Sequence, residues 1–103
     1  MASSKDYLEY ILDQLSGLDE ISYRPMMGEY ILYYREKVIG GIYDDRFLIK
    51  PTPSAERIIP DAKKELPYDG AKPMMLVEDT DNRDLLRELI TSMWNELPQK
   101  KKR

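Results

Sequence analysis

A run of acidic and polar residues, Glu78–Asp84, is the first segment whose residue types suggest chemistry. Alternating carboxylates of this kind resemble the start of a calcium-binding loop. Counted from Asp79, however, the sixth position lacks the glycine that such a loop needs, and the twelfth is Ile90, which cannot supply a bidentate carboxylate. We therefore predict no metal site here, and we expect these carboxylates to lie at the positive end of a helix.

Asp44 and Asp45 are a second candidate, because paired carboxylates can act as general acid and base. Adjacent residues on an extended strand point to opposite faces of a sheet, and a turn between strands holds both side chains in water. A carboxylate in water is a poor proton donor at neutral pH. We predict that this pair forms a turn.

The chain contains no histidine and no cysteine. Disulfides, thiolate chemistry and cysteine-based zinc sites are therefore excluded, and the side chain best suited to proton transfer near neutral pH is missing. The sequence also lacks G-x-S-x-G, S-x-x-K and P-loop motifs. The Gly40-Gly41 pair has no dinucleotide fingerprint around it and indicates a β-bulge or a close approach of backbones. We predict no catalytic residues, no cofactor and no enzymatic activity.

The eight tyrosines raise the question of nucleic-acid binding, because an exposed aromatic face can stack bases. Four of them fall on predicted strands: Tyr30, Tyr33, Tyr34 and Tyr43. Tyrosine is a preferred strand residue in its own right, and these four lack interleaved Lys and Arg. The structural interpretation is therefore favoured.

The net charge is −3, and the basic tail at residues 100–103 holds four positive charges, so residues 1–99 carry −7. An acidic body repels phosphate backbones. We predict that DNA binding is weak or indirect. The longest uncharged apolar-rich run, Val38–Tyr43, has six residues, whereas a membrane-spanning helix needs about 20. We expect a cytoplasmic protein without membrane contact, with one domain over residues 1–99 and a disordered tail.

The strongest helical pattern covers residues 85–97, where apolar residues follow one stripe. Thr80 or Asp81 can cap this helix, and Pro98 ends it. Trp94, the single tryptophan, falls on the stripe. We predict that Trp94 lies between this helix and the sheet, and that its replacement by alanine costs roughly 3–5 kcal/mol.

Two further helices are predicted. Residues 7–15 carry an apolar stripe, with Ser3 resembling the first residue of a capping box and Gly17 as a stop signal. The Thr52-Pro53 pair is an N-cap followed by proline at the first helical position, and Pro60 must break the helix that it begins.

Between the first two helices the apolar period falls to about two, which indicates strands at 30–34, 38–43 and 46–49, with 21–24 before Pro25 as a further candidate. Breaks of two or three residues join antiparallel strands. Residues 74–78 are predicted to form one more strand. The expected fold class is α+β: two layers, with an antiparallel meander sheet and helices packed on one face, in the order α-β-β-β(-β)-α-β-α.

The segment Tyr23–Tyr30 resembles the opening of the TfoX/Sxy N-terminal domain, which shows an R-x-M-F-G-G-Y-like sequence. Four positions fit: Arg24, Met26, Gly28 and Tyr30. Met27 and Glu29 replace the usual Phe and second Gly.

Three later segments match in the same order: residues 45–50 resemble the family's D-x-L-Y-L-K-like strand, residues 68–74 its Y-x-G-A-K-P-type turn, and residues 81–86 the start of its last helix. The likeness covers nearly the whole chain.

The resemblance implies a two-layer α+β domain without attributed catalytic residues. In competence regulators of this kind the domain helps to activate transcription alongside the cyclic-AMP receptor protein, and longer members carry a C-terminal helical domain as well. We expect a stand-alone N-terminal domain that acts as a regulatory, protein-binding module, with the transcription machinery among its candidate partners. The alternatives are a nucleic-acid-binding domain with Tyr-rich strands and a small-molecule-binding domain. A homodimer is left open.

Four residues are predicted to border the partner-binding surface: Arg24, Met27, Tyr30 and Lys72. Arg24 and Lys72 belong to the segments that carry the family likeness, and binding groups tend to lie on loops held by a rigid scaffold. A small-molecule pocket near Arg24 and Lys72 would use the same surface. The alternative for Met27 and Tyr30 is that both are core residues.

Overall fold

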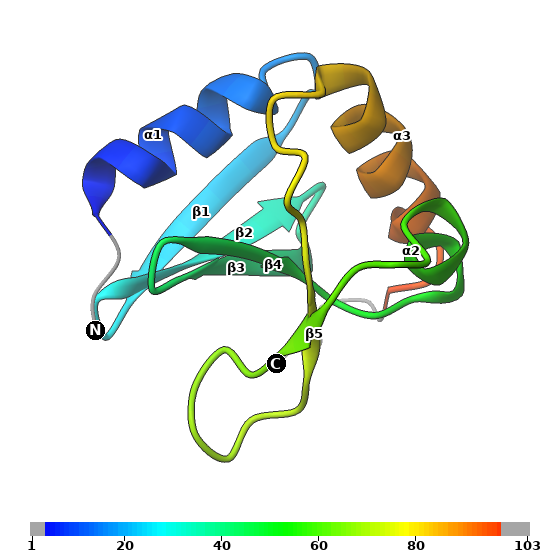
Figure 1. The fold of residues 1–103 in the computed structure, drawn as a ribbon. Coiled ribbons are helices and arrows are strands. Elements are labelled where there is room, and N and C mark those ends of the chain that lie inside the picture. The colour runs from blue at the N-terminus through cyan, green and yellow to red at the C-terminus, as the bar shows by residue number, and fades with distance from the viewer. Residues whose placement is uncertain (1–3, 98–103) are drawn as a thin grey trace, which may run out of the picture.

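The computed structural model describes residues 4–97, which form a two-layer α+β fold (Figure 1). The elements in chain order are α1 (Lys5–Gln14), β1 (Ile21–Met26), β2 (Glu29–Tyr34), β3 (Lys37–Tyr43), β4 (Arg46–Ile49), α2 (Pro53–Ile58), β5 (Lys64–Glu65), β6 (Met74–Leu76) and α3 (Arg83–Trp94). The strands pair antiparallel in the order β1-β2-β3-β4-β6-β5. The predicted fold class is confirmed. Strand β5 was not expected, because two residues are too short to show a period.

Three two-residue hairpins build the first four strands. Their loops are Met27-Gly28, Arg35-Glu36 and Asp44-Asp45, and every one of these residues has a positive φ, between 49° and 86°. Positive φ at both loop positions defines a type I′ turn, whose twist matches that of the flanking strands. The prediction that Asp44 and Asp45 form a turn is confirmed.

Strand β1 continues through Pro25 to Met26, two residues beyond its expected end. Met26 and Glu29 close the hairpin, so Pro25 falls at a position whose backbone points away from β2. A missing N–H costs no ladder hydrogen bond there, because β1 is the edge of the sheet.

Gly40 lies where two features of the sheet meet. The pairing of β2 with β3 shifts between Leu32 and Tyr33, which leaves Ile39 as the extra residue of a β-bulge. A Cβ on Gly40 would lie 2.1 Å from the carbonyl oxygen of Leu48 on β4. Both readings of the Gly40-Gly41 pair, a bulge and a close backbone approach, are confirmed.

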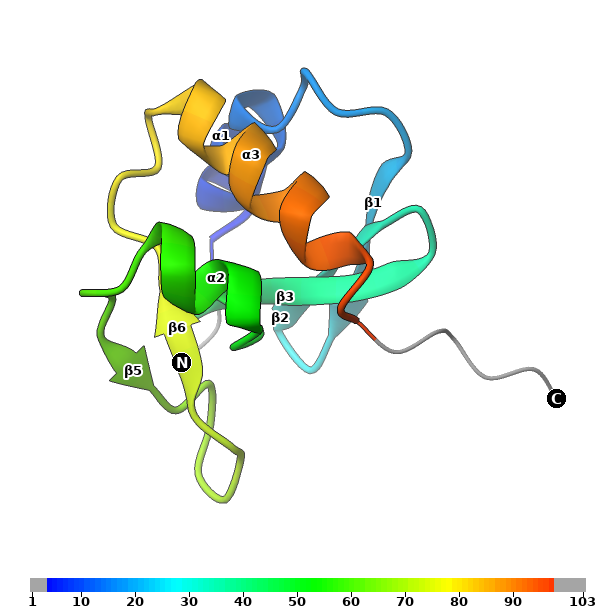
Figure 2. The same ribbon diagram turned by 90° about the vertical axis from the view of Figure 1, so that its right-hand side faces the viewer.

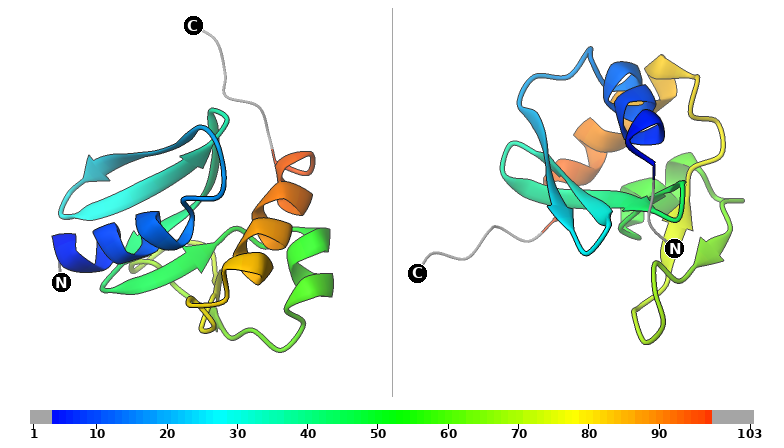
Figure 3. Two further views of the ribbon diagram at one scale, coloured as in Figure 1. Left: turned by 90° about the horizontal axis from the view of Figure 1, so that it is seen from above. Right: turned by 90° about the vertical axis from the view of Figure 1, so that its left-hand side faces the viewer.

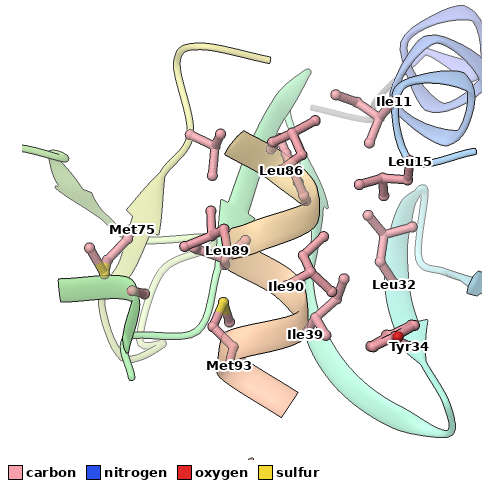
Figure 4. Close-up of a cluster of buried hydrophobic side chains, with 14 of the residues drawn as sticks. Ile11, Leu15, Leu32, Tyr34, Ile39, Met75, Leu86, Leu89, Ile90 and Met93 are labelled. Atoms are coloured by element: carbon pink, nitrogen blue, oxygen red, sulfur yellow. The ribbon is translucent and has the colours of Figure 1, made fainter. Parts of the chain in front are cut away.

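The helices cover one face of the sheet, with α1 and α3 above it and α2 beside α3 (Figures 2 and 3). Side chains from α1, α3 and this helix face of the sheet form the core (Figure 4). Tyr43 and Leu48 are buried outside that core cluster and belong to the opposite, open face. The loop between β5 and β6 folds beneath the open face (Figure 1).

The helix caps differ partly from the predicted ones. Thr52 caps α2 as expected, with its hydroxyl accepting from Ala55 N at 3.1 Å. In α1 the N-cap is Ser4, one residue after the predicted Ser3, and in α3 it is Asn82 in place of Thr80 or Asp81. Neighbouring Ser, Thr, Asp and Asn residues are all suitable N-caps. The position of the first helical turn therefore decides which of them reaches a free N–H. Ser3, Pro98 and the predicted basic tail lie outside the described residues.

Trp94 joins α3 to the sheet, as predicted. Its indole Nε1 donates to the carbonyl of Tyr34 at 3.0 Å, and the ring packs against the core while staying partly exposed. The Lys37 ammonium lies 4.0 Å from the ring centroid and donates to the Trp94 carbonyl at 3.0 Å. A cation at the C-terminal end of a helix is favourable, so the buried Lys37 is paired with both the ring and the helix dipole.

Candidate functional site

Three of the predicted site residues belong to the β1–β2 hairpin, where Arg24 and Tyr30 lie on opposite faces of the sheet. Arg24 is exposed on β1, Met27 is the first residue of the turn, and Tyr30 follows on β2. Tyr23 packs edge-on against Tyr30, with ring centroids 5.8 Å apart, and Tyr30 contacts the core. The core interpretation therefore holds in part for Tyr30 but not for Met27, whose side chain is 97% exposed.

Lys72 lies elsewhere. It belongs to the loop that precedes β6, and three strands separate β6 from β1 in the sheet. Four inter-strand steps of about 4.8 Å correspond to roughly 19 Å. The structure therefore does not bring Lys72 together with Arg24, and the pocket that Lys72 lines does not include Arg24.

Lys72 instead borders a pocket of about 480 Å³ on the open face. The pocket is lined by β3, by residues 50–52 after β4, by the loop at residues 67–74, and by residues 96 and 97 after α3. Its polar and aromatic lining comes from Lys50, Lys72, Tyr43, Tyr68, Thr52 and Glu96. Apart from Lys72, none of these residues was predicted to line a binding site. The signal that pointed to this region was the family-like turn at residues 68–74.

Arg46 fixes one end of the loop that closes this pocket. Its guanidinium donates to the Tyr43 carbonyl, to Glu65 Oε1 at 2.6 Å and to the Leu66 carbonyl. Within the loop, Ala71 N donates to the Tyr68 carbonyl across a turn in which Gly70 has a φ of 86°. These contacts hold the loop against the sheet.

Burial raises the pKa of the Tyr43 hydroxyl, and the neighbouring Tyr68 adds to this effect. The two rings are 6.4 Å apart. A raised pKa keeps the hydroxyl protonated throughout the neutral range, so Tyr43 can act as a hydrogen-bond donor and not as a base.

The tyrosines of the meander do not share one exposed face. Tyr30 and Tyr34 belong to the helix face, where both contact the core, whereas Tyr43 lies on the open face. Tyr34 and Tyr43 are both buried. Stacking of successive bases needs several exposed rings side by side.

The net negative charge is concentrated in the two segments that contain α1 and α3. Residues 4–20 and 78–94 hold ten carboxylates and three basic side chains, whereas the other described residues hold nine of each. These two segments repel polyanions, and the rest of the described chain is formally neutral. Among residues 4–97, no group of three or more potential ligands could hold a metal ion, and no helix could cross a bilayer.

Comparison with known proteins identifies the family. Residues 13–93 match the TfoX N-terminal domain. The chain belongs to this family. A TfoX N-terminal domain is not a known catalytic domain. The matched span begins within α1 and ends within α3, so it includes both the hairpin and the pocket.

A relative from Spirochaeta aurantia, described as an uncharacterized 12.7 kDa protein in the trpE 5′ region, is 32% identical over 107 residues. The alignment covers 99% of this chain and 93% of the relative. No solved structure matches the chain.

Glu96 connects the end of α3 with the start of α2. Its carboxylate accepts from Ser54 N at 2.9 Å and from the Ser54 hydroxyl at 2.7 Å. These two hydrogen bonds, with smaller contributions from Thr52 and Arg57, lower the pKa of Glu96 below the ordinary value of 4.5. The contacts therefore favour the charged form.

Replacing Glu96 by glutamine is expected to destabilise the domain at neutral pH. The free energy of unfolding should then fall less steeply as the pH is lowered below neutral. Because the folded-state pKa is lowered, the stabilisation is present above pH 4.5 and is lost as pH falls through the folded-state value. Urea unfolding at pH 7, 5 and 3 measures this. Glu88→Gln, at an exposed position of α3, is the control. Equal losses at all three pH values for Glu96→Gln would contradict the assignment.

Proposed function

We propose that this chain is a non-enzymatic, protein-binding module that presents the β1–β2 hairpin to a protein partner. The observation that carries the proposal is the position of Met27. Its φ of 54° is unfavourable for a residue with a Cβ, and 97% of its side chain is exposed to water. Neither backbone conformation nor packing in the domain explains a methionine there. An apolar residue with an unfavourable backbone conformation and a fully exposed side chain indicates a role in recognition.

The neighbours of Met27 extend the same surface. Met26 is 44% exposed, and Arg24 is exposed on the same face of β1; Tyr23, which is 41% exposed, lies on the opposite face of this edge strand. Methionine adapts its shape to a partner, and arginine and tyrosine are enriched at interface centres. A partner with an apolar groove and an acidic rim for Arg24 fits this chemistry. The proposal that this partner belongs to the transcription machinery is supported by the part that TfoX N-terminal domains play in competence regulators.

Met27→Asn separates recognition from folding. Asn-Gly is the preferred pair for a type I′ turn, so this variant is expected to be more stable than the original by about 0.5–1 kcal/mol while losing partner binding. Arg35→Asn changes the first position of the β2–β3 turn, where φ is 49°, and is the matched control. Asparagine tolerates a positive φ, so this variant should fold and keep the partner.

Site-specific photocrosslinking tests the surface in cells. A benzophenone side chain at position 27 should crosslink to a defined protein that the same group at Asp69, in the β5–β6 loop, does not reach. Arg24→Glu should remove that crosslink. Identical crosslinked species from positions 27 and 69 would refute the proposal. Crosslinking of position 27 to nucleic acid would refute it in favour of a nucleic-acid-binding domain.

A further inference from the structure

The pocket on the open face has features that protein binding by the hairpin does not use. Lys50 and Lys72 both line it, and within residues 4–97 neither ammonium has an ion-pair or hydrogen-bond partner. Both ammonium groups are therefore available to a ligand in the pocket. An anion bound between them would form charge-assisted hydrogen bonds with both.

The carboxylate in the lining does not neutralise these lysines directly. Each oxygen of Glu96 already accepts a hydrogen bond from Ser54, at 2.9 and 2.7 Å. Among the described residues, the lining holds two ammonium groups and one carboxylate, which give a net single positive charge. This balance favours a ligand with one negative charge.

The rest of the lining is apolar, aromatic and rigid. Pro51, Pro67 and Pro73 have fixed φ angles, and the rings of Tyr43 and Tyr68 lie 6.4 Å apart at one wall. Arg46 ties the start of the loop to β4. A volume of about 480 Å³ lies within the range of small-molecule sites, roughly 300–1,000 Å³. A pocket with fixed walls loses little entropy on binding.

We infer that this pocket binds a small organic monoanion with a flat apolar body, such as an aromatic carboxylate or sulfonate. The anionic group lies between Lys50 and Lys72, and the apolar body contacts the tyrosines and prolines. The site is on a different part of the sheet from the β1–β2 hairpin, so it does not depend on the proposed protein partner.

The probe for this test is 8-anilinonaphthalene-1-sulfonate, an aromatic monoanion whose fluorescence rises in apolar surroundings. Titration of the full chain should give one site. Lys50→Gln/Lys72→Gln should raise the Kd at least about tenfold, because two charge-assisted contacts are lost. Lys5→Gln/Lys63→Gln makes the same charge change at exposed positions away from the pocket and should leave the Kd unchanged. The neutral analogue N-phenyl-1-naphthylamine should bind the original chain more weakly than the sulfonate.

Amide chemical shifts locate the probe. Saturation with the sulfonate should move the signals of Gly40, Ala71 and Leu97, which line the pocket, and not those of Met27 or Gly28. The inference is overturned if the folded protein does not bind the sulfonate, if both double variants lose the same affinity, if the neutral analogue binds as tightly, or if the shifts cluster elsewhere. None of these results bears on crosslinking at the hairpin.

Discussion

Replacing Gly40 by alanine is expected to destabilise the domain by about 3 kcal/mol or more. The new Cβ would lie 2.1 Å from the Leu48 carbonyl oxygen and 2.7 Å from the Ile49 Cα. Both atoms belong to the backbone of β4, so no side-chain rotation can relieve the clash. Strands β3 and β4 would have to separate at the centre of the sheet, beside the bulge at Ile39.

Gly70→Ala is the matched control for this prediction. Gly70 has a φ of 86°, and a Cβ there meets nothing within 4 Å. Its replacement should cost only the free energy of placing a residue with a Cβ at this positive φ, about 1–2 kcal/mol. Urea midpoints of the two variants measure the difference. If Gly40→Ala were no less stable than Gly70→Ala, this result would contradict the close approach of the β4 backbone to Gly40.

Replacing Trp94 by alanine is expected to cost about 3 kcal/mol, the lower end of the sequence-based range, since the ring is only partly buried. The change removes the contact with the core, the hydrogen bond to the Tyr34 carbonyl and the aromatic face beneath the Lys37 ammonium. A loss of this size is a large share of the 5–15 kcal/mol that typically stabilises a domain.

Trp94→Phe separates these contributions. Phenylalanine keeps an aromatic face but cannot donate to Tyr34, so its cost should be about 1 kcal/mol. Denaturant unfolding of both variants gives the two values. The fluorescence of Trp94 should be blue-shifted relative to free tryptophan and only partly quenched by iodide. Emission like that of free tryptophan, with full quenching, would show that α3 turns this residue outward.

Local features of the sequence determined the layout of this protein. The apolar stripes of residues 7–15 and 85–97 predicted α1 and α3, and the period of two predicted the meander. These signals depend on residues a few positions apart, which is the range over which a helix or strand places side chains on one face. The short polar breaks likewise predicted two of the three turns. They did not predict the turn at Met27-Gly28, because a proline such as Pro25 usually indicates the end of a strand.

Tertiary structure decided what the candidate sites consist of. Arg24 and Lys72 belong to family-like segments, yet the strand order places them at different parts of the sheet. Lys50, Lys72 and Glu96 line one pocket because β6 pairs with β4 and Glu96 reaches Ser54. Such proximity arises from strand pairing and helix packing between distant segments, and no local period records it. The sequence therefore determined the elements and the absence of His and Cys chemistry, whereas long-range pairing determined which side chains meet.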